Sequence, residues 1–183
     1  NAELLSTLGV EQPKQQLRPL HMVLAKGPAL KPLYAHCLGG GTKPRVTVTT
    51  HPAADGQWVW YLGGDLAEAD GVTRDAAAQI KAAQQEMADL LPWVDQSATQ
   101  WVTLRVDRAE PAQSGLVRPD NAFLAEQERL LVGWPTKLAL APDFADRVLA
   151  ALQRDGIQPG QHAALPALPR PSVATAVWDT LLP

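Results

Sequence analysis

The sequence predicts an α+β fold, with a mainly antiparallel sheet and helices packed on one face. Two observations lead to this class. Hairpin-type turns separate most of the strand-like segments, and the expected order of elements is four strands, a helix, two strands and a helix. The chain of 183 residues is 46% hydrophobic, which is enough for one domain with a sizeable core.

The first part of the chain is expected to be mostly strands. Residues 2–8 are expected to form a short helix that ends at Gly9, and four strands follow over residues 15–26, 33–38, 45–50 and 57–62. The third strand alternates β-branched residues (RVTVTT), and Asp55-Gly56 after it is a hairpin signal. The fourth, QWVWYL, is apolar on both faces, which predicts a central position in the sheet.

The clearest amphipathic helix comes next. Thr73 is its expected N-cap, and Pro92 is expected to stop it after Leu91. A long strand over residues 98–107 and a loop over residues 110–121 complete this region.

A short strand over residues 129–132 leads through a glycine-proline turn into the last helix, which is expected to begin near Pro142 and end at Gly156. Its apolar stripe is Phe144, Val148, Leu149 and Leu152. The Pro/Ala-rich remainder is expected to be a tail that packs through Leu165, Leu168 and Trp178.

Composition excludes several classes of function. The net charge of −3 and the lack of a basic cluster argue against a nucleic-acid partner. No apolar run is long enough to span a membrane, and no signal peptide is visible, which favours a cytoplasmic location. Cys37 is the single cysteine and the four histidines are scattered, so neither a disulfide framework nor a metal site is expected. The start at Asn1, without a methionine, suggests a piece of a larger protein.

The segment Gly133-Trp134-Pro135-Thr136-Lys137 is the most informative place for chemistry. A turn between a strand and a helix presents free backbone N–H groups and the positive end of the helix dipole, and Lys137 adds a full charge. The alternative is a plain connection with a solvated lysine, and the residues leave both interpretations open. The six tryptophans likewise fit either an aromatic pocket or a core with few phenylalanines.

In these segments the chain resembles the C-terminal half of FAD-dependent oxidoreductases of the D-amino acid oxidase and glycerol-3-phosphate dehydrogenase (DAO) superfamily. RVTVTTHPAADGQWVWYLGG is similar to the family's substrate-domain hairpin, and GVTRDAAAQIKAAQQEMADLLPWVD to its long helix. WVTLRVDRAEP looks like the following strand, GLVRPDNAFL like an arginine segment, and LLVGWPTKLALAPDFADRVLAAL like the returning strand, turn and helix. The resemblance covers roughly residues 1–153.

The resemblance implies a division of the chain. Residues 1–14 would be a crossover helix from a missing FAD domain, and residues 15–128 an antiparallel substrate (cap) domain. Residues 129–156 would be a returning strand-turn-helix that belongs to the FAD-binding half, and residues 157–183 a tail.

The resemblance also implies roles for individual residues. The implied cofactor-binding positions are those of the glycine turn: Gly133, Trp134, Thr136, Lys137 and Leu138. The implied catalytic residues are Arg118 and Lys137. The candidates for holding an anionic substrate are Arg45, Tyr61, Arg108 and Arg118. The guanidinium of an arginine binds a carboxylate or phosphate through two parallel hydrogen bonds. The GxGxxG phosphate loop of the family is absent, so FAD is expected in the full-length parent and not in this chain.

The leading hypothesis is the substrate half of an FAD-dependent oxidoreductase that oxidises a small anionic amine or hydroxy compound by hydride transfer, inactive as an isolated chain. Its expected partners are the substrate and the missing FAD-binding half. A membrane-associated electron acceptor and a homo-oligomer stay open. The alternative is a non-catalytic module that binds a ligand or protein on a Trp-lined sheet face.

Overall fold

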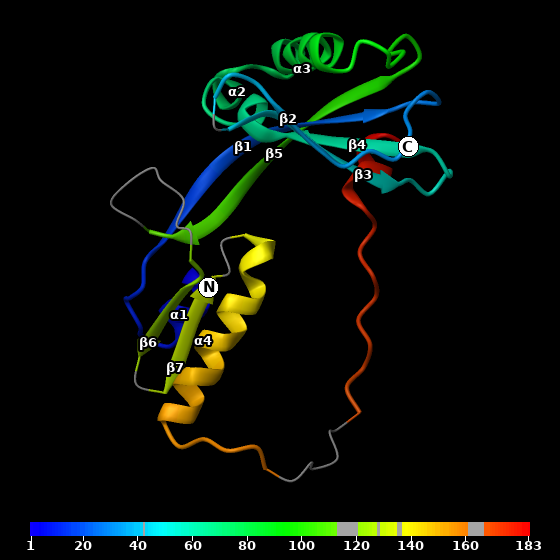
Figure 1. The fold of residues 1–183 in the computed structure, drawn as a ribbon. Helices are drawn as coiled ribbons and strands as arrows, with labels where there is room; N and C mark the ends of the chain where they lie inside the picture. The colour runs from blue at the N-terminus through cyan, green and yellow to red at the C-terminus, as the bar shows by residue number, and fades with distance from the viewer. Residues whose placement is uncertain (42, 113–120, 128, 135–136, 161–166) are drawn as a thin grey trace. The chain divides into compact units, whose positions relative to one another are not determined.

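The computed structural model describes residues 1–41, 43–112, 121–127, 129–134, 137–160 and 167–183. The chain divides into two compact units (Figure 1). Unit 1 comprises Asn1–Arg18 and Ala109–Arg170, and unit 2 comprises Pro19–Arg108 and Pro171–Pro183. Each unit has its own secondary structure.

A five-stranded sheet dominates unit 2, in the order β2-β3-β4-β1-β5. The strands are β1 (Gln15–Lys26), β2 (Ala35–Leu38), β3 (Pro44–Pro52), β4 (Trp58–Gly63) and β5 (Gln100–Pro111). The pairs β2–β3, β3–β4 and β1–β4 are antiparallel. The predicted class, α+β with a mainly antiparallel sheet, is confirmed. The central position predicted for the fourth strand is also confirmed, since β4 is in the middle of the order.

Helix α3 (Ala76–Leu90) covers one face of this sheet (Figure 1). Its buried Ala83 and Met87 pack against Val23, Val48 and Leu62 of the strands. The predicted N-cap Thr73 is wrong. Thr73 ends the short helix α2 (Asp70–Thr73), the chain is extended at Arg74, and the carboxylate of Asp75 accepts the backbone N–H of Ala78 at 2.8 Å.

A buried polar contact joins α3 to the sheet and to the 3-10 helix η1 (Gly64–Ala67). The Gln79 side chain is fully buried, and its Nε2 donates to the carbonyls of His21, at 2.7 Å, and Leu66, at 2.9 Å. Arg74 Nη1 donates to its Oε1 at 3.1 Å. A buried amide without hydrogen-bond partners would destabilise the fold. These bonds therefore help to fix the position of α3 on the sheet.

The described residues of unit 1 include a hairpin and three helices. Its elements are α1 (Ala2–Thr7), β6 (Phe123–Gln127), β7 (Leu130–Trp134), the 3-10 helix η2 (Leu138–Leu140) and α4 (Ala141–Arg154). The two strands are antiparallel. Helix α1, α4 and the strand before α4 were expected from the sequence, but β6 was not, because FLAEQ is short and lacks alternation. It is a strand because it pairs with β7.

Two further expectations need correction. The segment expected to be a loop from residue 110 is still strand up to Pro111, while residues 113–120 lie outside the described part. In the tail, Leu168 is 79% exposed and does not pack, and Leu165 lies outside the described residues. Trp178 does pack, as expected, against an apolar cluster of the unit 2 sheet.

Candidate functional site

The second face of the unit 2 sheet differs from the face under α3. Here the described residues pair a small apolar cluster with a polar, partly open surface. The buried members of the cluster are Leu24, Ala53, Val59 and Leu182. Leu182 comes from the C-terminal segment that carries helix α5 (Val177–Leu181), which therefore covers part of this face (Figure 1).

The polar surface beside it has three members, Thr49, His51 and Tyr61, which we call the open face. Thr49 lies opposite Tyr61 in the β3–β4 register, so the two side chains share this face. His51 Nε2 lies 3.2 Å from the Thr49 hydroxyl, and its ring contacts Tyr61 edge-on at 6.3 Å between centroids. The three side chains are therefore adjacent on two neighbouring strands.

Tyr61 is the member best suited to contact a ligand. Its side chain is partly buried, and burial raises the pKa of its hydroxyl. The group therefore stays protonated at neutral pH and can donate a hydrogen bond. In the part of the chain that the structure describes, no partner takes this hydrogen bond.

Arg45, another predicted substrate-binding residue, does not lie on the open face. A β-bulge between β2 and β3 leaves Arg45 without an opposite residue. Its guanidinium reaches α3, with Nε 3.0 Å from Glu86 and Nη2 3.6 Å from Asp89. Two carboxylates thus already match its charge, and Tyr61 and Arg45 are not brought together.

Arg108 also has a carboxylate nearby. Its Nη2 lies 3.9 Å from Glu68 Oε1. Arg118, the other candidate for anion binding and catalysis, lies outside the described residues, as does Thr136.

The glycine turn of unit 1 begins later than expected. Gly133 and Trp134 are the last residues of β7, while Lys137 and Leu138 are exposed at the start of η2, before α4. A Cβ on Gly133 would lie 2.0 Å from Phe144 Cε2, so the close approach of α4 explains this glycine. Trp134 contacts Phe123 edge-on at 5.8 Å.

Other reactive groups give no second site. Burial and the nearby Glu86 raise the pKa of the Cys37 thiol, which keeps it protonated at neutral pH. Within the described ranges, no three His, Cys, Asp or Glu side chains are grouped as metal ligands. Nor does any helix there have the length and apolar character needed to cross a membrane.

Sequence reasoning singled out Tyr61 but not Thr49 or His51. A signal for both was present, because Thr47, Thr49 and His51 place a polar residue at every second position of β3. Trp178 was expected to pack, but its partner His51 is 127 residues away in sequence and could not be foreseen.

The fold defines an α+β chain with a mainly antiparallel sheet, and a comparison with a solved structure agrees with it. No protein-family model matches the chain. It is 71% identical over 179 residues, 98% of its length, to a protein of Pseudomonas aeruginosa named "Probable FAD-dependent oxidoreductase PA4991". It matches the crystal structure of the FAD-dependent oxidoreductase PA4991 from that organism with a TM-score of 0.90 and 69% identity over all of this chain. The chain spans about half of these relatives, 46% of the curated protein and 50% of the crystallised chain.

Proposed function

We propose that this chain is the substrate-side half of an FAD-dependent oxidoreductase of the DAO superfamily, which oxidises a small anionic amine or hydroxy compound. The observation that carries the proposal is the 71% identity, over 98% of the chain, to a relative named as a probable FAD-dependent oxidoreductase. The chain spans only 46% of that relative, which leaves room for a separate FAD-binding half.

The residues present fit the substrate side of such an enzyme and not the dinucleotide. The sequence has no GxGxxG loop to hold a pyrophosphate. Gly133, the glycine of the predicted cofactor turn, has Phe144 where a Cβ would point, so packing already accounts for it. The open face, in contrast, offers a hydroxyl donor and an imidazole beside an aromatic wall. In this proposal the other half of the protein holds FAD.

When bound, FAD would supply the acceptor for the hydride of the substrate C–H bond, and an external acceptor would be needed to reoxidise it. The residues of this chain bind and orient the substrate. The protonated Tyr61 hydroxyl donates to the anionic group of the substrate, and His51, held by Thr49, lies next to that group. Arg118 and Arg108 stay candidates for the charge partner, and Lys137 and Leu138 for contacts at the flavin edge. A cytoplasmic location, a membrane-associated acceptor and a homo-oligomer stay predictions.

The experiment compares the full-length gene product with this chain alone. We expect the full-length protein to purify with bound FAD, and a panel of small amino and hydroxy acids to contain compounds that bleach the flavin absorbance without oxygen. The isolated chain should not retain FAD on gel filtration. A full-length protein without flavin, or an isolated chain that binds FAD at micromolar affinity, would contradict the proposal. In the first case the non-catalytic binding module is the better interpretation.

The two tyrosines of the chain provide a matched pair of variants. Tyr61→Phe should raise KM for an anionic substrate by about 10- to 100-fold, because a hydrogen bond to a charged group is lost. Tyr34→Phe is the control, since the Tyr34 hydroxyl already donates to the carbonyl of Thr50 at 2.9 Å. Equal effects of the two substitutions on KM would remove Tyr61 from the substrate site.

A further inference from the structure

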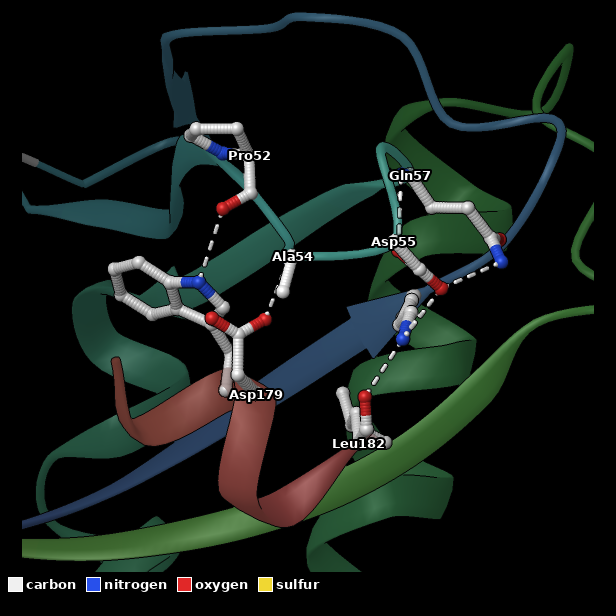
Figure 2. Close-up of polar contacts among 8 residues, drawn as sticks. Pro52, Ala54, Asp55, Gln57, Asp179 and Leu182 are labelled. Carbon is white, nitrogen blue, oxygen red and sulfur yellow. Dashed lines mark hydrogen bonds and ion pairs between the residues drawn. The ribbon is translucent and has the colours of Figure 1, made fainter. Parts of the chain in front are cut away.

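The C-terminal segment Val177–Leu182 is attached to the sheet by polar contacts as well as by apolar packing. Trp178 Nε1 donates to the carbonyl of Pro52 at 3.1 Å, and the Asp179 carboxylate accepts the backbone N–H of Ala54 at 2.8 Å (Figure 2). Both bonds go to the backbone where β3 turns toward β4. They therefore fix the segment at one defined place on the sheet.

A buried lysine fixes the other end of the segment. Lys26, only 3% exposed, donates through Nζ to the carbonyl of Leu182 at 2.7 Å and pairs with the Asp55 carboxylate at 2.9 Å (Figure 2). The hydrogen bond from Lys26 lowers the pKa of Asp55, so this carboxylate is ionised at neutral pH. Leu182 itself is 5% exposed and packs among Leu24 and Val59.

Between α4 and α5 the described residues form no helix or strand. The position of α5 is therefore set by these contacts and not by a rigid element that leads into it. A helix of this length would not be stable in isolation. The segment is in effect a clasp, defined here as residues Val177–Leu182.

The clasp places an aromatic ring at the edge of the open face. The Trp178 indole stacks on His51, with ring centroids 4.4 Å apart and planes at 24°, and His51 in turn contacts Tyr61. Because Trp178 Nε1 already bonds to Pro52, the indole offers bulk and an apolar surface rather than a free donor. One side of the open face is thus made by the clasp and not by the sheet.

We propose that the clasp is a wall of the substrate site and that Trp178 is the residue that limits the size of the substrate accepted beside Tyr61. This inference rests on the proposed function, since it assumes that substrate binds at the open face. Trp178 acts by occupying space and by holding the His51 ring in place. Removal of the indole should therefore raise kcat/KM for large substrates. It should change kcat/KM for the smallest substrate much less.

The experiment uses the full-length protein with a series of 2-amino and 2-hydroxy acids of increasing side-chain size, from alanine and lactate to phenylalanine and phenyllactate, and a dye as electron acceptor. Trp178→Ala should raise the ratio of kcat/KM for large over small substrates by about tenfold or more, because a pocket contact contributes factors of that order to discrimination. Trp93→Ala is the matched control: Trp93 is 76% exposed and lies in the loop after α3. It should leave the ratio unchanged.

Two more variants keep the test decisive if Trp178→Ala does not fold. Trp178→Phe keeps a ring on His51 but removes the bond to Pro52, and Asp179→Ala removes the bond to Ala54 without touching the indole. Both should shift the ratio in the same direction by less. A ratio equal to that of wild type in every folded clasp variant would overturn the inference, even in a fully active enzyme. A wild-type protein that reduces no flavin with any substrate would instead contradict the proposed function.

Discussion

The two units differ in how completely they bury their apolar residues. In unit 2 the sheet has an apolar cluster on each face, one under α3 and one under the clasp. In unit 1 the hairpin β6–β7 packs against α4, and Leu4, Leu8, Leu138, Leu149 and Ile157 are all more than half exposed. A two-stranded sheet is marginal by itself. We therefore expect unit 2 to fold independently, and unit 1 to need further surface, which the proposed FAD-binding half would supply.

The largest expected effect is in the core of unit 2. Leu62 in β4 is 0% exposed, and Leu62→Ala should lower the free energy of unfolding by about 2–5 kcal/mol, because it leaves a cavity under α3. Denaturant titration followed by circular dichroism measures this change. The control Leu38→Ala, at a leucine 63% exposed on the edge strand β2, should stay within about 0.5 kcal/mol of wild type. Similar losses in both variants would mean that unit 2 lacks the cooperative core described.

The contact between β7 and α4 tests unit 1. Gly133→Ala would place its Cβ against the Phe144 ring, which should destabilise this unit by about 1–3 kcal/mol. Hydrogen exchange should show faster exchange in α4 while the amides of β4 keep their protection. Gly160→Ala, at a glycine with nothing within 4 Å of a Cβ, is the control.

A second substitution sharpens that test. Gly133→Ala combined with Phe144→Ala removes the ring that the new methyl group meets, so the two changes should be less damaging together than their separate effects predict. Strict additivity would show that the close approach of Phe144 does not account for the glycine.

The smallest expected effect is a pH dependence of unit 1. The backbone N–H of Ala122 and the side chain of Arg147 lower the pKa of the Asp143 carboxyl below its ordinary value of 3.8. A lowered folded-state pKa contributes stability that is complete above the ordinary value and is lost as the pH falls through the folded-state pKa. Acidification below 3.8 should therefore lower the protection factors of the α4 amides, in which the intrinsic pH dependence of exchange is divided out.

Asp143→Asn keeps an oxygen for the Ala122 N–H but does not titrate, so it should flatten this acid dependence. Asp146→Asn is the control on the same helix, because no hydrogen bond or ion pair joins the Asp146 carboxylate to the described residues. If both variants keep the acid dependence of wild type, Asp143 is not its source. Protection factors measured from pH 7 down to about pH 2 cover the ordinary carboxyl value and the range below it, where the loss is expected.

Local signals predicted much of unit 2. The β-branched alternation of β3, the Asp55-Gly56 turn and the two apolar faces of β4 each depend on residues close together in sequence, and all three agree with the structure. The open face was only partly predicted. Tyr61 was named as a candidate, but so was Arg45, which is turned toward α3 by a bulge that its own segment does not reveal.

The sequence by itself determined the class of fold, the central strand and the long helix. The spacing of apolar residues and the residue types of turns, on which these depend, are properties of residues close together in sequence. Only the tertiary structure decided which polar residues meet. Trp178 reaches Pro52 across 126 positions, and β6 becomes a strand only by pairing with β7. Such contacts depend on where the whole chain places its elements, and no local pattern records that placement.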